Sequence, residues 1–451
     1  MGTPDFMAKV DKPVTVAVET HGCKLNQADS LVLSKEFQVA GFSIVPAYSP
    51  SDVYVVNTCT VTHVADRKGR QAARAAKKRN PNATVVVTGC YAERDRESIE
   101  AIEEVDFVFG NTSKTDLVKT VSEIVGAEVT TVEHFADFHM ADYSGRNRAM
   151  LKIQEGCNQV CSYCIVPYVR GRERSVPIAE IIKNISRFER EGFHEVVLTG
   201  TQLGSYGFDL QDTTLVDLIS CVLERTKIPR IRLSSLQPQE IDVKLLDLWD
   251  NKRLCPHFHV PLQSGSNEVL KRMKRKYSSD DFARALKMIR GQVPDASITS
   301  DIIVGFPGES NEDYLRTQRL CEESDFSDVH IFKFSSRPGT AAHHLLDNVP
   351  PTLKSERSAN LIEIGKRSFS EFRRKYDGRT MQVLWESKKS GFDDEKNVTG
   401  LTSNYIRVEA LVRNTNETLS EVVLKFDENH PYGNMGVLRD SLPQRKKLFG
   451  F

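Results

Sequence analysis

The sequence predicts a multidomain α/β protein with a small doubly wound α/β domain, a partial, TIM-like (βα)6 barrel and a small C-terminal β-barrel. Three observations support this fold class. A length of 451 residues is more than one compact core normally organises. Short apolar segments alternate with helical segments over residues 13–127 and again from residue 148. Strand-like segments separated by turn breaks then end the chain.

The N-terminal region, residues 13–127, contains four apolar segments that are typical of buried parallel strands: "VTVAVET", "DVYVVN", "ATVVVTG" and "DFVFG". Segments with helical periodicity lie between them, such as "DSLVLSKEFQVAG" and "DRKGRQAARAAKKRN". This alternation predicts a doubly wound sheet whose strands end at one common edge. Residues 128–147 show no clean period, and we expect them to form a linker.

The second region, residues 148–376, contains six strand candidates: "AMLKIQEG", "HEVVLTG", "RIRLSS", "HFHVPL", "SITSDIIVGF" and "SDVHIFKFS". Helical segments such as "IAEIIKNISRFEREG" separate them, and a polar helix at about 353–376 follows. Six βα units indicate a partial barrel instead of a closed eightfold one. The segments "TMQVLWESK", "NVTGLTSNYIRVEAL" and "SEVVLKF" then predict a small OB-like barrel over residues 378–445.

Composition narrows the functional classes. The chain has 61 basic and 61 acidic residues, so any nucleic-acid site must be a local patch. No apolar run approaches the ~20 residues of a membrane span and no signal peptide is recognisable, which predicts a cytoplasmic protein without membrane contact. Nine clustered cysteines fit a reducing compartment better than a disulfide framework.

Three cysteines, Cys157, Cys161 and Cys164, lie close together in "EGCNQVCSYCIVPYVRGR", on the loop after the first strand of the second region. Active-site groups of α/β barrels occupy that end of the strands. Structural zinc is the alternative, but it normally requires four ligands, and the neighbouring strand ends supply no obvious fourth Cys or His. Three thiolates on an iron–sulfur cluster leave one iron open for a ligand. The spacing therefore favours an iron–sulfur cluster.

A second set of cysteines occurs in the N-terminal region. Cys23, Cys59 and Cys90 each follow a predicted strand, in "ETHGCKLN", "VVNTCTVT" and "VVTGCYA". Because parallel strands end at one edge of a sheet, we expect these cysteines to converge. Buried structural thiols are the alternative, but these belong inside strands and helices, as Cys221 does in "LISCVLER". A second three-cysteine cluster is the favoured interpretation.

The pattern C-x3-C-x-aromatic-C, with Tyr163 as the aromatic residue, resembles the signature of radical S-adenosylmethionine (SAM) enzymes. The resemblance implies a [4Fe–4S] cluster whose open iron binds SAM and whose reduction yields a 5′-deoxyadenosyl radical. The later strand ends "TGTQ", "RLSS" and "IVGFPGE" are similar to the segments that contact SAM in that superfamily. The implied cofactor-binding residues are Tyr163, Thr199, Gly200, Gln202, Ser234, Ser235 and Gly305.

Two cysteine triads followed by a β-rich tail resemble the methylthiotransferases over nearly the whole chain, which implies that the C-terminal barrel is a TRAM domain. "HGCKLNQADS" and "NTCTVTHVADRKGRQAARAAKKRNP" are most similar to the bacterial branch that acts on N6-threonylcarbamoyladenosine (t6A) at tRNA position 37. The resemblance implies conversion of t6A37 to ms2t6A37 with two [4Fe–4S] clusters, the auxiliary one carrying the sulfur, and two SAM molecules per turnover. It implies no acid–base catalytic residue.

Three alternatives remain open. The branch that modifies isopentenyladenosine typically reads closer to GCQMN at the first cysteine, and the branch that modifies a ribosomal protein reads closer to GCPKN. Lys24 and Leu25 therefore favour the threonylcarbamoyladenosine branch. A non-catalytic, metal-dependent RNA-binding protein is the alternative from another class.

RNA binding would depend on local charge in "DRKGRQAARAAKKR", "YVRGRER" and "KRMKRK". Ordinary solvated helix faces are the alternative, but two of the three runs adjoin cysteine loops, which favours phosphate contact. The candidates are Arg70, Arg74, Lys77, Lys78, Arg170, Arg172, Arg275 and Lys276, with Tyr405 and Arg407 in the C-terminal barrel. The partners that we expect are the anticodon loop of tRNA, at adenosine 37, and a flavodoxin- or ferredoxin-type electron donor. We expect a monomer.

Overall fold

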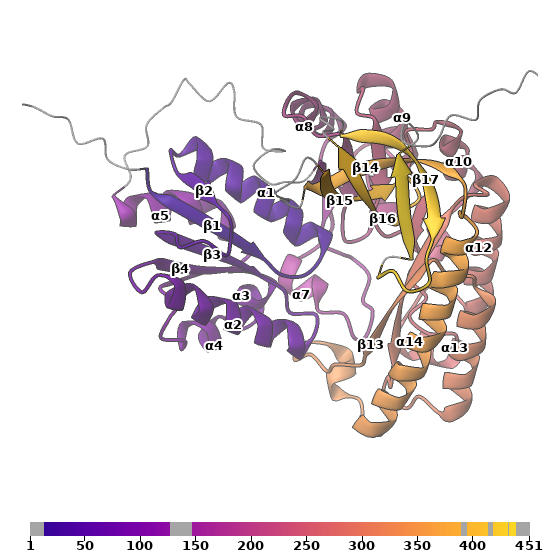
Figure 1. Cartoon of the computed structure of the whole chain (residues 1–451). Coiled ribbons are helices and arrows are strands. Elements are labelled where there is room, and N and C mark those ends of the chain that lie inside the picture. The colour runs from indigo at the N-terminus through magenta and orange to yellow at the C-terminus, as the bar shows by residue number, and fades with distance from the viewer. Residues whose placement is uncertain (1–12, 127–146, 389–394, 414–417, 432, 439–451) are drawn as a thin grey trace, which may run out of the picture. The chain divides into compact units, whose positions relative to one another are not determined.

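The computed structural model describes residues 13–126, 147–388, 395–413, 418–431 and 433–438 (Figure 1). Among these, residues 13–126 and the segment Tyr168–Arg170 form one compact unit, and the remaining residues form a second. Apart from residue 147, the predicted linker lies outside the described residues, as does the end of the predicted C-terminal barrel, residues 439–445. Within the described part of the chain, no helix has the length and apolar composition needed to cross a membrane.

The first unit is built on a parallel sheet with the strand order β2-β1-β3-β4-β5. Its strands are β1 (Thr15–Thr20), β2 (Ser43–Val45), β3 (Val53–Thr58), β4 (Thr84–Gly89) and β5 (Phe107–Phe109). The predicted doubly wound sheet is therefore confirmed, with β2 as a short additional edge strand. The strand order reverses between β1 and β3, and ligands bind at such switch points in doubly wound sheets.

Helices cover both faces of this sheet. They are α1 (Lys24–Val39), α2 (His63–Arg79), α3 (Cys90–Arg94), α4 (Arg96–Glu100), η1 (Lys114–Asp116) and α5 (Leu117–Val125). Successive strand residues point to opposite faces. Val53 and Val55 pack in one cluster with Phe37 of α1, whereas Tyr54 packs in the other with Ala73 of α2. Burial on both faces explains the uninterrupted apolar strands.

The second unit contains six parallel strands that follow one another in chain order. They are β6 (Arg148–Lys152), β9 (Glu195–Thr199), β10 (Arg230–Leu233), β11 (His257–His259), β12 (Ser297–Val304) and β13 (Asp328–Lys333). Parallel bridges between Ser235 and His259 and between Ile231 and Leu254 join the two three-stranded ladders. The six-unit partial barrel is thus confirmed, and all six strands end at one edge.

The helices of this unit lie between the strands in sequence, and α13 and α14 lie side by side (Figure 1). The longer ones are α8 (Ile178–Arg190), α9 (Leu215–Arg225), α12 (Ser279–Gln292), α13 (Asn311–Glu323) and α14 (Pro351–Arg374). Capping boxes at Thr214, Ser278 and Ser310 satisfy amides at the starts of α9, α12 and α13. The short helices are α7 (Val166–Arg170), η2 (Leu203–Ser205), η3 (Pro238–Glu240), α10 (Val243–Leu246), η4 (Asp247–Asp250), α11 (Asn267–Arg272) and η5 (Ala341–His344).

A closed five-stranded barrel, with the order β14-β15-β16-β18-β17, follows α14. Its strands are β14 (Thr380–Lys388), β15 (Glu395–Thr402), β16 (Arg407–Arg413), β17 (Leu419–Phe426) and β18 (Asn434–Leu438), and β17 pairs with β14 to complete the circle. The predicted small barrel is confirmed. The segment "NVTGLTSNYIRVEAL" is two strands because Tyr405 turns the chain with a left-handed φ of 70°.

A buried ionic cluster connects this barrel to the six parallel strands. Glu195, which is fully buried, accepts two hydrogen bonds from Arg232, at 2.7 Å to Nε and 3.1 Å to Nη2. Nη1 of the same guanidinium donates to the carbonyl of Ser403, at 3.0 Å, in the turn between β15 and β16. Arg230 likewise donates to the carbonyl of Leu401, at 2.9 Å. Paired charges of this kind are costly to break once they are buried.

Candidate functional site

The loop that carries Cys157, Cys161 and Cys164 starts where β6 ends. A two-residue hairpin, β7 (Gln154–Glu155) with β8 (Arg174–Ser175), closes its base. Gly156 has a left-handed φ of 78°, and a Cβ atom there would lie 2.0 Å from the carbonyl oxygen of Arg172. Only glycine fits this close approach. The amide of Cys157 donates to the carbonyl of Gly171, at 3.1 Å, so the loop starts from a fixed position.

The three thiols of this loop lie in a partly desolvated environment. Burial raises the pKa of Cys157 to about 11 and that of Cys164 to about 12, and the neighbouring Cys161 contributes to both shifts. The thiols of Cys157 and Cys164 are therefore protonated in the absence of a metal, and metal binding would displace these protons. The charge of Arg275 acts in the opposite direction on both groups and favours the thiolate.

Arg275 follows α11 and points into the cysteine loop. Its Nη1 donates to Sγ of Cys161 at 3.3 Å, and its Nη2 donates to Oε1 of Gln237 at 3.1 Å. The guanidinium also packs over the ring of Tyr277. The sequence suggested a phosphate contact for Arg275. In the structure the charge of Arg275 lies against the cysteine loop instead, whereas the neighbouring Lys276 is exposed.

A row of polar side chains follows the ends of β9 and β10. The backbone amide of Gln202 donates to Oε1 of Gln154 at 3.0 Å, and its side chain is hydrogen-bonded to Gln237 and Glu240. Burial raises the pKa of Glu240 to about 7. Within the described residues, the buried Oγ of Ser234 has no hydrogen-bond partner, which leaves it able to bind a ligand. Gln154, Gln237 and Glu240 were not among the residues predicted from sequence.

The remaining cofactor candidates have the following positions. Tyr163 packs edge-on against Phe306, with ring centroids 6.5 Å apart, which brings the cysteine loop to the end of β12 beside Gly305. Gly200 leaves no space for a side chain, because a Cβ there would lie 2.8 Å from Oε1 of Gln154. Thr199 is buried at the end of β9. Ser235 is hydrogen-bonded to Nδ1 of His259 at 2.7 Å.

The N-terminal cysteines lie at the carboxyl ends of three adjacent strands. Cys23 is the N-cap of α1 after β1, Cys59 follows β3, and Cys90 starts α3 after β4. Gly22 has a φ of 102°, and a Cβ there would lie 2.6 Å from that of Cys59. Burial, together with the charges of Cys23 and Cys90, raises the pKa of Cys59 to about 12. The structure thus brings the three cysteines together at the switch point of the sheet.

Each triad offers three cysteine thiols, a donor set that fits an iron–sulfur cluster. Within the described residues, no three His, Cys, Asp or Glu side chains form a set that could hold one metal ion. Thiolates alone are the donor set that such clusters prefer, and each triad would leave one iron open.

The structure separates the eight basic candidates for RNA contact into two groups. Arg74, Lys78, Arg172 and Lys276 are exposed, although Nε of Arg74 lies 3.8 Å from a carboxylate oxygen of Glu104. The other four make contacts within the protein: Arg70 with the hydroxyl of Tyr91, Lys77 with Asp106, Arg170 with Asp29 and Arg275 with Cys161. Two further cations of α2, Arg67 and Lys68, are exposed. The exposed residues are the ones that phosphates can reach.

The two RNA candidates of the C-terminal barrel also make contacts within the chain. Tyr405 stacks on His257, with centroids 4.3 Å apart, and the guanidinium of Arg232 lies 4.9 Å from its ring centroid. These contacts do not support the interpretation of Tyr405 as a platform for bases. Arg407 lies 3.6 Å from the carboxylate of Glu386.

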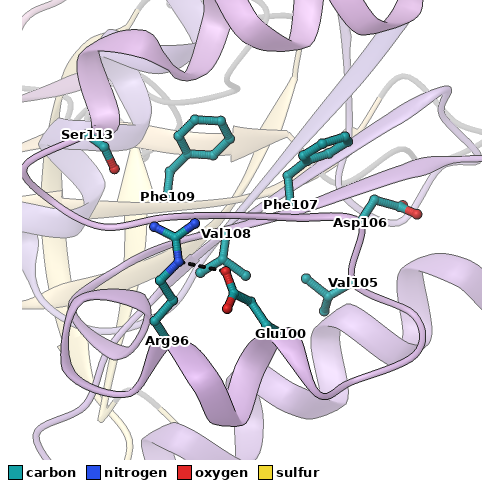
Figure 2. A pocket seen from close by; sticks show the side chains of 8 residues that line it. All are labelled: Arg96, Glu100, Val105, Asp106, Phe107, Val108, Phe109 and Ser113. Carbon is teal, nitrogen blue, oxygen red and sulfur yellow. Dashed lines mark hydrogen bonds and ion pairs between the residues drawn. The ribbon is translucent and has the colours of Figure 1, made fainter.

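A separate hollow lies along the edge strand β5 of the first unit (Figure 2). Figure 2 shows Phe107 and Phe109 above it and the ion pair of Arg96 with Glu100, at 2.6 Å, below it. No cysteine lines this hollow, so it belongs to neither triad.

Two protein-family models match the chain. Residues 15–110 match the family described as "Uncharacterized protein family UPF0004", and residues 151–321 match the radical SAM superfamily. Among solved structures, the radical S-adenosylmethionine methyltransferase TsrM from Kitasatospora setae is similar, with a TM-score of 0.53 and 15% identity over 73% of this chain and 74% of that one. This likeness concerns the fold.

Curated relatives match most of the chain. The threonylcarbamoyladenosine tRNA methylthiotransferase MtaB of Bacillus subtilis is 34% identical over 96% of this chain and 99% of its own. Its Aquifex aeolicus counterpart is 40% identical over 82% of this chain and 92% of its own. The tRNA-2-methylthio-N(6)-dimethylallyladenosine synthase of Dictyoglomus thermophilum is 34% identical over 86% of this chain and 90% of its own.

A cysteine loop at the strand ends of a six-strand partial barrel, together with the matching superfamily model, defines a radical SAM enzyme. Such an enzyme uses SAM and a [4Fe–4S] cluster. The similarity to the curated relatives extends over most of the chain and defines the family more narrowly. The chain belongs to the radical SAM methylthiotransferases of the MtaB type.

Proposed function

We propose that this protein adds a methylthio group to C2 of N6-threonylcarbamoyladenosine at position 37 of tRNA. One observation carries this proposal: a single chain presents two cysteine triads, each at the carboxyl ends of parallel strands in its own sheet. The names of the two MtaB relatives support threonylcarbamoyladenosine as the base.

Cys157, Cys161 and Cys164 would hold the [4Fe–4S] cluster through their thiolates. Reductive cleavage of SAM to a 5′-deoxyadenosyl radical is the chemistry that this group supplies when bound. Gln202 and Ser234, at neighbouring strand ends, would contact SAM, and the free hydrogen-bonding capacity of the Ser234 hydroxyl supports this role. Gln154 fixes the backbone of Gln202 and so orients this contact.

Cys23, Cys59 and Cys90 would hold a second [4Fe–4S] cluster and, through it, the sulfur to be transferred. One SAM molecule would provide the methyl group and another the radical, and a flavodoxin- or ferredoxin-type protein would provide the electron. Carbon 2 of adenine carries an unactivated hydrogen, so we assign no side chain as a general acid or base. The protein supplies position and electrostatics.

The exposed cations of α2 and those near the cysteine loop would contact the tRNA backbone. Phosphate contacts of Lys and Arg position a nucleic acid without reading its sequence. Arg67, Lys68 and Lys78 on α2, with Arg172 and Lys276, are exposed and meet this requirement.

Mass spectrometry of tRNA nucleosides from a strain that lacks the gene tests the proposal. We expect t6A to accumulate, ms2t6A to disappear, and the native gene to restore it. Accumulation of an isopentenyladenosine precursor instead would support the second candidate, which the Dictyoglomus thermophilum relative favours. Unchanged tRNA nucleosides would contradict both tRNA activities and would support a protein substrate.

A further inference from the structure

The segment Tyr168–Arg170 belongs to the compact N-terminal unit, although in sequence it follows the cysteine loop of the radical SAM domain. Arg170, at its end, is only 4% exposed. Its Nη2 donates to Oδ1 of Asn26 and, at 3.1 Å, to Oδ2 of Asp29. Asp29 is itself buried and also pairs with Lys114 at 3.1 Å. A cation is buried in this way only where a carboxylate compensates for its lost hydration.

The partner of Arg170, Asn26, connects two of the cysteine loops. Its Nδ2 donates to the carbonyl of His21, at 2.7 Å, and to that of Thr58, at 2.9 Å. His21 is two residues before Cys23, and Thr58 directly precedes Cys59. By holding Oδ1 of Asn26, Arg170 keeps the amide group in the orientation that joins both loops.

The third cysteine loop is reached as well. Burial raises the pKa of Cys90, and the charge of Arg170 together with a hydrogen bond from it lowers that pKa. Asn111 donates from Nδ2 to Sγ of Cys90, at 3.7 Å, and to the carbonyl of Val169, at 2.7 Å. The segment therefore interacts, directly or through one side chain, with the loops of all three N-terminal cysteines.

We propose that Arg170 is the positioning residue of the N-terminal cysteine site, holding Asn26 and supplying the buried positive charge beside Cys90. The site that residues 13–126 form is incomplete without the segment Tyr168–Arg170. This inference rests on the proposed function, in which Cys23, Cys59 and Cys90 hold a cluster. It also replaces the phosphate contact that the sequence suggested for Arg170.

The test uses full-length protein in which Cys157, Cys161 and Cys164 are all changed to Ala, so that only the N-terminal cluster can form. This parent should hold about four iron and four sulfide per chain after reconstitution. Arg170→Gln and Arg170→Lys are introduced into it, with Arg96→Gln as the matched control, since Arg96 is an exposed cation of the same compact unit. The readouts are iron content, the EPR spectrum of the reduced cluster and its midpoint potential.

Removal of a nearby cation makes reduction of a cluster less favourable, because reduction adds negative charge. We expect Arg170→Gln to disfavour reduction about tenfold, a shift of about 59 mV to more negative potential for one electron. It should also change the EPR spectrum and accelerate loss of iron to a chelator. Arg170→Lys keeps the charge but not the planar fork, so it should restore part of the potential. Arg96→Gln should behave as the parent.

An Arg170→Gln protein with the parent's potential, spectrum and iron retention would overturn this inference alone. If the glutamine variant does not fold, the lysine variant is used for the test. Its EPR spectrum and its rate of iron loss are then compared with those of the parent, and equal values would overturn the inference. Absence of iron from the parent would overturn the two-cluster function itself, and the inference with it.

Discussion

The guanidinium of Arg275 lies 3.3 Å from the sulfur of Cys161 and donates a hydrogen bond to it. Its charge also lowers the pKa values of Cys157 and Cys164, against the effect of burial. A fixed cation thus acts on the whole radical SAM triad. Reduction potentials of iron–sulfur clusters depend on nearby charge and on hydrogen bonds to the sulfurs.

Replacement of Arg275 should therefore make this cluster harder to reduce. In a protein with Cys23, Cys59 and Cys90 changed to Ala, we expect Arg275→Gln to shift the midpoint potential by about 60 mV to more negative values, which corresponds to one charge-assisted hydrogen bond of about 1.4 kcal/mol. An EPR-monitored redox titration measures the shift. Lys276→Gln is the control, since Lys276 is exposed. Equal potentials in both variants would show that Arg275 has no electrostatic role.

The two triads should separate by function. Cys59→Ala should prevent formation of ms2t6A, yet the protein should still convert SAM to 5′-deoxyadenosine under a strong reductant, because the radical SAM triad lies in the other compact unit. Cys161→Ala should do neither. Chromatography of both products measures the outcome. Loss of a cluster can unfold the domain that holds it, so the comparison requires soluble protein of normal mobility. Methylthiolated tRNA from folded Cys59→Ala protein would refute the two-cluster proposal.

Charge reversal on α2 should weaken tRNA binding. We choose Arg67, Lys68 and Lys78 because they are exposed. Their replacement by Glu should lower the affinity and flatten its dependence on salt, since fewer counterions are released on binding. Filter binding at several salt concentrations measures both effects. Exposed cations on the other compact unit, Lys244 and Lys252, serve as a matched control. An unchanged salt slope would exclude this helix from the tRNA footprint.

The buried pair of Glu195 and Arg232 should contribute strongly to the stability of the second unit. Glu195→Gln leaves the fully buried Arg232 without its carboxylate, so we expect a loss of about 3–5 kcal/mol in free energy of unfolding. Both tryptophans, Trp249 and Trp385, belong to this unit, so their fluorescence during urea unfolding reports its stability. Glu363→Gln, which breaks the exposed pair with Lys366, should cost at most about 1 kcal/mol. Similar losses in the two variants would contradict this prediction.

Glu240 should make the stability of this unit depend on pH. Its pKa is raised to about 7 by burial, whereas an unfolded Glu titrates near about 4.3. Between these values the folded protein binds more protons, so its stability falls as the pH rises, by at most about 1.4 kcal/mol per pH unit for this group. Glu240→Gln should remove this fall between about pH 5.5 and 7, measured by urea unfolding. Glu268→Gln, which removes an exposed carboxyl group, should leave this fall in place. An unchanged dependence of the unfolding free energy on pH in the Glu240 variant would refute the assignment of the effect to Glu240.

Much of the fold could be predicted because parallel strands buried on both faces leave uninterrupted apolar segments. The strand β2 could not, since it has three half-buried residues at a sheet edge. The boundary between β15 and β16 could not be predicted either. The turn depends on a left-handed Tyr405, which local sequence disfavours and which stacking on His257 supports from far along the chain.

The cysteines could be predicted because each one follows a strand, and topology then brings strand ends together. The basic residues could not be sorted in this way. Arg170 and Arg172 are two positions apart in the same charged segment, yet one is buried and the other is exposed. The partner of Arg170, Asp29, lies 141 positions away, and no local pattern reveals such a pairing. Gln154, Gln237 and Glu240 were missed for the same reason.

The inclusion of Tyr168–Arg170 in the N-terminal unit affects the order of events on the ribosome. When residue 126 has been synthesised, all five strands of the sheet exist, but the cation that completes the cysteine edge is still 44 residues away (170 minus 126). At typical translation rates of about 5–20 residues per second, the nascent sheet waits about 2–9 s for it. A cluster inserted into the N-terminal cysteines before the radical SAM cysteine loop emerges would lack this cation, and we expect it to lose iron faster until Arg170 arrives.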